Sequence, residues 1–294
     1  MRNGSRAPGR EGRTEARIEP RDGFVQVNGL RLHYLESGEP TRPPVLLLHG
    51  GSAHAHWWDL FAACLVDRYR VLALDLRGHG NSDWAEAGGY GLDRYTADVR
   101  SFAEALELRQ LTVAGHSFGG LVAIAAASAL DERLAALIVI DTRAKVTERA
   151  ARFMDALRRL PHPVYGSFDE AIRRFRLLPA ANGASAEVLA HLARHAVRQE
   201  ADGTWTLKFD RRAIVNTRPC DLSAALSAVT CPALFVRGSE SQLVSAAALA
   251  ELAAASPDAE TAEIAGAHHH VMIDQPQALA GIVRDFLRRA GLES

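Results

Sequence analysis

Short apolar runs recur along this chain and alternate with longer segments in which apolar residues return every three or four positions. The runs occupy residues 45–48, 71–74, 111–114, 137–140 and 233–236. Such runs are typical of strands that are buried on both faces of a parallel sheet. After Asp93, an expected N-cap, apolar residues at 95, 99, 102 and 106 share one helical face. Alternating strands and helices predict an α/β fold with right-handed crossovers.

The N-terminal part of the sheet is expected to differ from the rest. Residues 24–27 and 30–36 are short extended runs on either side of Asn28-Gly29, a strong signal for a two-residue hairpin. A hairpin at this point predicts an antiparallel edge on an otherwise parallel sheet of about eight strands.

A second departure begins near residue 142 and lasts to about 219, where no buried-strand run occurs. Charged helical segments lie at 148–160, 169–178 and 186–199. They are followed by Asp202-Gly203 between short extended pieces. We interpret this stretch as a helical cap that covers one end of the sheet. The expected organisation is a disordered arm at 1–22, a core at 23–141 and 220–294, and the cap at 142–219.

Composition narrows the class of protein. The chain has 294 residues, 48% of them hydrophobic, and a net charge of −1, which suits one globular domain with an insertion and gives no attraction for nucleic acid. The first twenty residues hold five arginines and no apolar core of a signal peptide. Residues 111–130 lack charge, but their centre is Gly-His-Ser-Phe-Gly-Gly, so a buried strand and helix explain them better than a membrane span.

The cysteines give no sign of metal binding or of a redox site. Cys64, Cys220 and Cys231 are an odd number without the spacing of either kind of site. Nothing indicates disulfides, which suits a reducing cytoplasm. We expect no cofactor and no metal, and a monomer or homodimer.

The candidate nucleophile lies in the sequence G-x-S-x-G, from Gly115 to Gly119, between an apolar run and an Ala-rich segment. A serine on so tight a strand-to-helix turn takes a strained backbone conformation. Its neighbours two positions before and after must be nearly free of side chains, so that strand and helix can approach. Ser117 is therefore the expected nucleophile.

A serine nucleophile needs a base, and the base needs an acid that orients it. Three histidines, at 268–270, follow the last expected strand and lie at the ligand-binding edge of an open α/β sheet. Adjacent loop histidines cannot all point one way, and no carboxylate cluster accompanies them, so a metal site is not expected there. Asp141 and Glu240 both follow strands at the same edge, and either could be the acid.

Acyl transfer also needs donors for the developing oxyanion. The backbone N–H of Phe118 lies at a helix N-terminus, which suits an anion. The second donor is expected from the loop His49-Gly50-Gly51, where glycines let the backbone approach a substrate.

Together these pieces resemble the α/β-hydrolase family over about residues 24–290. The resemblance rests on four motifs in the family's order: the HGG loop at 49–51, D-x-R-G-x-G-x-S at 75–82, G-H-S-F-G-G at 115–120, and 266–276, which is similar to G-A-G-H-x-x-x-x-D-Q-P. In that last motif the base is the fourth residue, which is His269. Most relatives carry an Asp in the loop that holds Glu240 here, whereas a minority carry the acid at the position of Asp141, which we prefer.

The resemblance implies a serine hydrolase that cleaves an ester, lactone or thioester of a small, largely apolar substrate through an acyl-enzyme. Ser117, His269 and Asp141 would form the triad, and the backbone N–H groups of Gly51 and Phe118 would hold the oxyanion. Some serine relatives instead cleave carbon–carbon bonds or act as cofactor-free haloperoxidases, and some members of the family only bind ligands. These alternatives stay open on the sequence.

Overall fold

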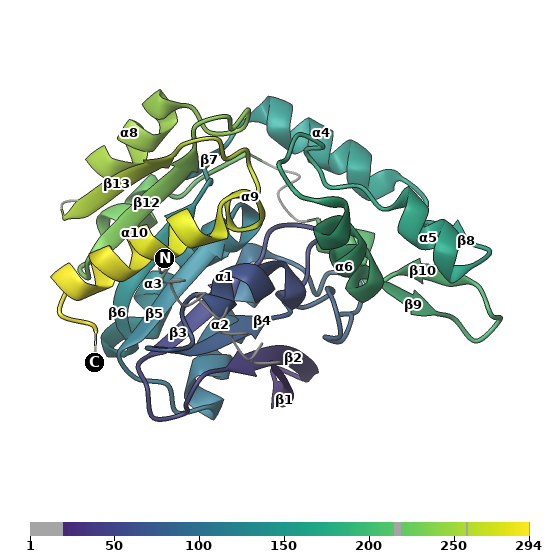
Figure 1. The fold of residues 1–294 in the computed structure, drawn as a ribbon, viewed down its shortest axis with the longest axis horizontal. Helices are drawn as coiled ribbons and strands as arrows, with labels where there is room; N and C mark the ends of the chain where they lie inside the picture. Colours follow the sequence, from purple (N-terminus) through teal and green to yellow (C-terminus); the bar gives the residue numbers. More distant parts are fainter. Residues whose placement is uncertain (1–19, 215–218, 257, 294) are drawn as a thin grey trace, which may run out of the picture.

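The computed structural model describes residues 20–214, 219–256 and 258–293. An eight-stranded sheet has the order β1-β2-β4-β3-β5-β6-β12-β13 (Figure 1). The antiparallel pairs are β1 with β2 and β2 with β4, and the other neighbours are parallel. The strands are β1 (Arg21–Val27), β2 (Leu30–Ser37), β3 (Pro44–Leu48), β4 (Arg70–Leu74), β5 (Leu111–His116), β6 (Leu134–Ile140), β12 (Ala233–Gly238) and β13 (Ala259–Ile264).

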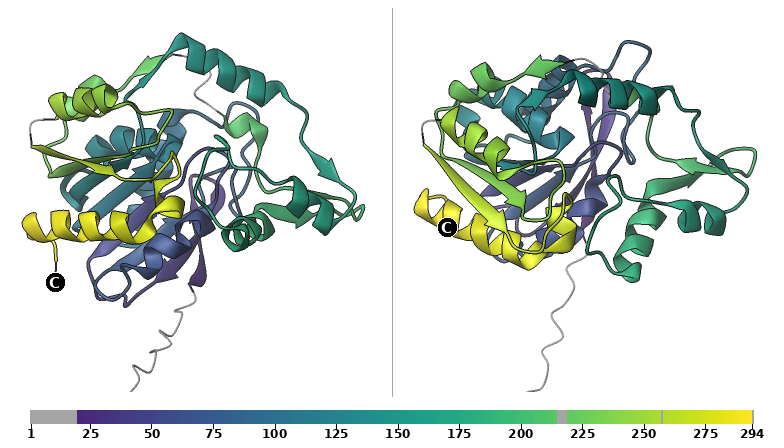
Figure 2. Two further views of the ribbon diagram at one scale, coloured as in Figure 1. Left: turned by 45° about the horizontal axis from the view of Figure 1, so that its top comes forward. Right: turned by 90° about the horizontal axis from the view of Figure 1, so that it is seen from above.

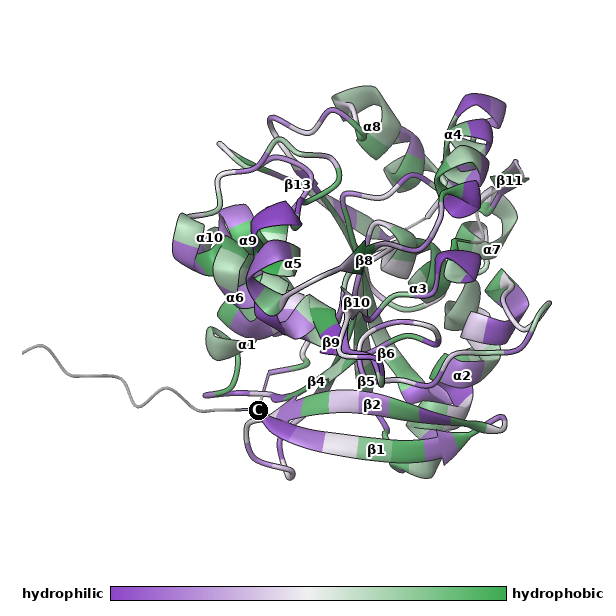
Figure 3. Cartoon of the chain, turned by 90° about the vertical axis from the view of Figure 1, so that its right-hand side faces the viewer, coloured by the Kyte–Doolittle hydropathy of each residue, from purple (hydrophilic) through white to green (hydrophobic). Residues whose placement is uncertain are grey.

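Helices cover both faces of the sheet. The core helices are α1 (Asp59–Ala63), α2 (Leu92–Ala105), α3 (Phe118–Leu130), α7 (Ser223–Ser227), α8 (Ala246–Ala254), α9 (Val271–Asp274) and α10 (Pro276–Arg289). Short 3-10 turns are η1 (Ala55–Trp58), η2 (Asp131–Arg133) and η3 (Arg211–Ala213). In Figure 3, α10 and α4 of the cap show both purple and green segments, as expected for amphipathic helices that cover a core.

The apolar runs are explained by two hydrophobic cores, one on each face. Leu46 and Leu48 of β3 enter the core formed with α2 and α3, whereas Val45 and Leu47 enter the core formed with α1 and α10. Successive strand residues point to opposite faces, so a strand covered on both faces must be apolar at every position.

Between β6 and β12 the chain leaves the sheet and builds the cap, which projects beyond one end of the core (Figure 2). Its helices are α4 (Glu148–Arg159), α5 (Phe168–Arg174) and α6 (Ala186–Ala196). A small antiparallel sheet joins β8 (Val164–Tyr165), β10 (Trp205–Leu207) and β9 (Val197–Gln199). At the base of the cap, β7 (Lys145–Val146) pairs with β11 (Cys220–Asp221).

The helices of the cap begin at residues suited to that place. Thr147, Ser167 and Ser185 each accept the backbone N–H of the third residue that follows them. Such caps satisfy donors that would otherwise have no partner in the first turn. The local sequence therefore determines where each cap helix begins.

Several expected boundaries were wrong by a few residues. Helix α2 has Gly91 as its N-cap, and Asp93 lies in its first turn. Helix α6 ends at Ala196, because residues 197–199 pair with β10 instead of continuing the helix. Arg21 and Asp22, placed in the arm, belong to β1 and pair with β2. Residues 1–19 of the predicted arm lie outside the described residues. Over the described ranges, none of the helices has the length and apolar character that a bilayer crossing requires.

Candidate active site

Ser117 occupies the sharp turn between β5 and α3. Its φ of 52° and ψ of −117° are strained for a residue with a side chain. A Cβ on Gly115 would come within 2.2 Å of the Gly119 carbonyl oxygen, and one on Gly119 within 2.2 Å of the Leu48 carbonyl oxygen. The two glycines are therefore required by the close approach of strand, helix and neighbouring strand that holds Ser117 in this conformation.

Asp141 and His269 lie next to each other at the same edge of the sheet. Nδ1 of His269 is 2.6 Å from Oδ2 of Asp141, and both side chains are almost fully buried. Asp141 directly follows β6 with a left-handed φ of 46°. Its carboxylate also accepts hydrogen bonds from the Ser241 hydroxyl, at 2.6 Å, and from the Gly238 N–H, at 3.1 Å. Three donors thus fix the carboxylate that orients the imidazole.

Burial dominates the electrostatics of this pair. Burial raises the pKa of Asp141 to about 7, although hydrogen bonds from Ser241 and Gly238 oppose the rise. Burial, with a smaller effect of His270, lowers the pKa of His269 to about 3. Because the two groups share a hydrogen bond, they take up one proton as a pair. Above about pH 7, His269 is neutral and its Nε2 can accept a proton.

Ser117 and His269 border one cavity of about 610 Å³ under the cap. Gly51 and Phe118, whose backbone N–H groups were the expected oxyanion donors, border it too. A Cβ built on Gly51 would lie 3.9 Å from Cβ of Phe118, so these two segments approach each other beside Ser117. The other lining residues are mostly apolar and come from the cap, and they include Phe153, Met154, Leu157, Leu178, Phe209 and Ile214.

The three adjacent histidines have different surroundings. Nδ1 of His268 is 3.3 Å from Asp274, and Nε2 of His270 donates to the Pro179 carbonyl oxygen at 3.0 Å. Only His269 reaches Asp141. A ring nitrogen of His116, His269 and His270 lies within 4.8 Å of the others, but Nε2 of His116 already donates to the His269 carbonyl at 2.9 Å. The structure thus separates the residue that was chosen as base from its two neighbours.

Glu240 does not reach His269. Its side chain is exposed and interacts with the Ser239 hydroxyl at 3.2 Å. The loop in which relatives commonly carry the acid instead supplies Ser241 to Asp141. Sequence reasoning missed Ser241, because a single serine in a polar loop gives no sign of the carboxylate to which it donates. It also missed His116, whose ring donates to the backbone carbonyl of His269. The available signal was its position inside the G-x-S-x-G motif, directly before Ser117.

A second buried Asp–His pair lies in the loop after β4. Oδ2 of Asp75 is 2.7 Å from Nδ1 of His33, whose Nε2 is 2.7 Å from Asp22. Oδ1 of Asp75 accepts the Ala55 N–H at 2.6 Å. Burial lowers the pKa of His33, but Asp75 and Asp22 outweigh it and leave the pKa above 6.5. This pair ties the D-x-R-G-x-G-x-S loop to strand β2, away from the cavity.

The order of strands and helices is that of one large fold family. The family model of the alpha/beta hydrolase fold matches residues 43–276, and the chain belongs to this family. Some of its relatives are hydrolases, and the similarity extends over nearly the whole length of those proteins. The chain is 27% identical to the 3-hydroxybutyrate-oligomer hydrolase of Cupriavidus necator over 89% of this chain and 96% of that one.

Two further similarities extend over most of the chain. An esterase of Mycobacterium tuberculosis is 30% identical, over 84% of this chain and 83% of that protein. The crystal structure of E-2-(acetamidomethylene)succinate hydrolase superimposes with a TM-score of 0.80, at 27% identity, and covers 92% of this chain and 99% of that one. The relatives are therefore hydrolases of more than one substrate.

Proposed function

We propose that this protein is a serine hydrolase that cleaves the ester bond of a small substrate through an acyl-enzyme. The observation that carries the proposal is the buried hydrogen bond of 2.6 Å between Asp141 and His269, at the wall of the cavity that Ser117 borders. The left-handed backbone of Ser117 at a strand-to-helix turn supports its role as nucleophile.

In the proposed mechanism Ser117 Oγ attacks the carbonyl carbon of the ester while Nε2 of His269 takes the hydroxyl proton. Asp141 holds His269 in the tautomer that leaves Nε2 unprotonated and stabilises the imidazolium that forms. The N–H groups of Gly51 and Phe118 stabilise the oxyanion. The carbon–oxygen bond to the alcohol breaks, and the alcohol leaves with the proton from His269. A water then attacks the carbonyl carbon of the acyl-enzyme and gives its proton to Nε2 of His269. The bond from that carbon to Ser117 Oγ breaks, His269 returns the proton to Oγ, and the acid leaves.

The residues that line the cavity restrict the class of substrate that it can bind. Arg143 and Arg149 border the same cavity as Ser117, and within the described chain neither forms an ion pair. The remaining lining is largely apolar, so these guanidinium groups are the positive charges at its wall. Arg recognises carboxylates well because of its planar fork of donors. A largely apolar ester that carries one carboxylate at its end therefore fits best. The names of two relatives include 3-hydroxybutyrate oligomers and a substituted succinate, and both of these compounds carry carboxylates.

Hydrolysis of p-nitrophenyl esters by wild-type protein and by Ser117→Ala tests the reaction. We expect turnover by the wild type, a loss of about 10⁴-fold or more in kcat/KM in the variant, and labelling of Ser117 by a fluorophosphonate. Absence of both turnover and labelling would leave a ligand-binding scaffold as the better function. Turnover of diketones but not of esters would favour carbon–carbon bond cleavage.

The two arginines are tested with esters that differ in one group. The monoester of a dicarboxylic acid should have a lower KM than its neutral diester in the wild type. In Arg143→Gln and Arg149→Gln that preference should fall by at most about fivefold, because an exposed ion pair contributes only about 1 kcal/mol. A preference for the neutral ester in the wild type would rule out a role for these arginines in substrate binding.

A further inference from the structure

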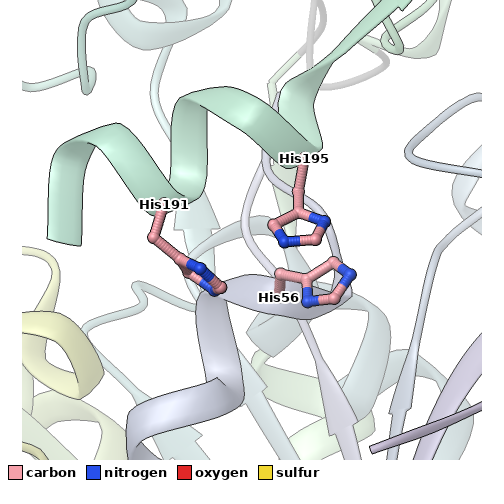
Figure 4. A group of neighbouring side chains, drawn as sticks. All are labelled: His56, His191 and His195. Carbon is pink, nitrogen blue, oxygen red and sulfur yellow. The ribbon is translucent and has the colours of Figure 1, made fainter. Parts of the chain in front are cut away.

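Three histidines outside the active site meet where the cap rests on the core. His56 lies in η1, and His191 and His195 lie one turn apart on α6 (Figure 4). One ring nitrogen of each lies within 4.8 Å of a ring nitrogen of the other two. The four-residue spacing puts His191 and His195 on one face of the helix, and Figure 4 shows both rings directed toward His56.

A carboxylate orients two of the three rings. Oδ2 of Asp59, the first residue of α1, is 2.9 Å from Nδ1 of His56 and 2.7 Å from Nε2 of His191. A carboxylate only accepts hydrogen bonds, so both of these nitrogens are donors. In a neutral ring the opposite nitrogen is then unprotonated and able to bind a metal. Outer carboxylates present metal-binding histidines in proteins in this way.

His195 supplies the third nitrogen. Its ring stacks on His56 with a centroid distance of 3.5 Å, and in the part of the chain that the structure describes neither of its ring nitrogens has a hydrogen-bond partner. An imidazole ring nitrogen that carries no proton has a lone pair for coordination. His195 can therefore offer the third nitrogen of the cluster.

The cluster has room and access for an ion. Cavities of about 330 Å³ and 100 Å³ both border His56, Asp59 and His191. The side chain of His191 is 38% exposed and that of His56 is 16% exposed, so both rings have room to rotate toward a bound ion. Tetrahedral Zn²⁺ with Zn–N distances of about 2.0–2.1 Å needs nitrogens about 3.3 Å apart, which modest side-chain rotations would reach.

We propose that His56, His191 and His195 bind a divalent transition metal, with Asp59 as the orienting carboxylate. Imidazole donors suit Zn²⁺, Ni²⁺ or Cu²⁺, whereas Mg²⁺ and Ca²⁺ prefer oxygen. The metal joins α6 of the cap to η1 of the core. Nε2 of His54, directly before η1, also donates to the Leu192 carbonyl of α6 at 3.1 Å, so the metal reinforces an existing contact between cap and core. The site lies outside the proposed catalytic residues and does not depend on them.

Calorimetric titration of the full-length protein with ZnCl₂ at pH 7.5, after treatment with EDTA and its removal, tests the site. We expect His191→Asn and His195→Asn each to weaken Zn²⁺ binding at least about tenfold. His162→Asn is the matched control, because this cap histidine interacts with the Leu207 carbonyl and not with the cluster. Its Zn²⁺ affinity should equal that of the wild type.

Thermal unfolding supplies a second readout. Excess Zn²⁺ should raise Tm of the wild type and of His162→Asn, but not of the His191→Asn/His195→Asn double variant. The Tm of each variant without metal shows whether it is folded. No binding by the wild type would overturn the proposal. Equal binding by the double variant would also overturn it, and loss of that binding in His270→Asn would then place the metal beside His116 and His269.

Discussion

Two buried Asp–His pairs, His33 with Asp75 and His269 with Asp141, have nearly the same geometry, with N···O distances of 2.7 and 2.6 Å. They differ in what the second ring nitrogen meets. Nε2 of His33 is held by Asp22, whereas His269 borders the cavity that Ser117 shares. The hydrogen bond to an aspartate is thus no sign of catalysis by itself. The opposite nitrogen must be available to a substrate or a nucleophile.

The two pairs also differ in charge. Burial raises the pKa of Asp75, but His33, His49 and the Asn81 N–H outweigh it and hold that pKa far below 3.8. With two carboxylates around it, His33 has a pKa above 6.5. The pKa of His269 is lowered and that of Asp141 is raised. One pair is an ion pair that fastens a loop, and the other is a neutral imidazole beside a carboxylate that can accept a proton.

Replacing each histidine in turn tests this contrast most strongly. His269→Asn should lower kcat/KM by about 10⁶-fold, because the proposed general base is lost, with little change in the urea midpoint. His33→Asn should leave kcat/KM of the folded protein within a few-fold and lower the urea midpoint. The reverse pattern would mean that the catalytic assignment belongs to the wrong pair.

The acid is tested by Asp141→Asn against Glu240→Gln. The first should lower kcat/KM by about 10⁴-fold, since the imidazole loses the acceptor that fixes its tautomer. The second should change it by less than about threefold, because Glu240 is exposed and does not contact His269. Steady-state kinetics on one ester suffices, and a large loss in Glu240→Gln alone would contradict the role of Asp141.

Asp75→Asn should lower the free energy of unfolding. Breaking a buried ion pair costs about 3–5 kcal/mol. The lowered pKa of Asp75 stabilises the fold above pH 3.8, and that contribution is lost as the pH falls below this value. The raised pKa of His33 stabilises it below pH 6.5, and that contribution is lost as the pH rises. Urea unfolding should therefore show a larger difference between wild type and variant at pH 5.5 than at pH 9.

The pH dependence of kcat/KM sharpens the comparison further. The pair of Asp141 and His269 takes up a proton near pH 7, and the proton disables the base. Activity should fall tenfold per pH unit below that value. In Asp141→Asn the residual activity should extend to lower pH, because burial, with a smaller effect of His270, lowers the pKa of His269 to about 3. An unshifted acid limb in the variant would mean that another group controls the pH dependence.

Much of the fold could be predicted from the sequence, because strands buried on both faces are apolar at every position. The expected strand at residues 45–48 became β3 with one added residue. The end of α6 could not be predicted, since the amphipathic pattern runs past Ala196 and only pairing with β10 ends the helix. Ser117 and His269 could be chosen from motifs. The support from Ser241 could not, because it depends on a fold that brings together residues 100 positions apart.

The cluster of His56, His191 and His195 shows the same limit. Two of its members have helical spacing that the sequence displays, but the third lies in the core and meets them only because the cap folds back onto η1. In the sequence the conspicuous group is the three adjacent histidines at 268–270. These adjacent histidines have different partners. The ring nitrogens of His56, His191 and His195 lie within 4.8 Å of one another, although His56 is distant in sequence from the other two.

The central claim is that Ser117 carries the acyl group during turnover. Rapid acid quenching of the enzyme with a slowly hydrolysed ester, followed by peptide mass spectrometry, measures this directly. We expect the peptide that contains Ser117 to gain the mass of the acyl group, and the gain to be absent in Ser117→Ala. Turnover without this adduct, or an adduct on another residue, would contradict the proposed mechanism.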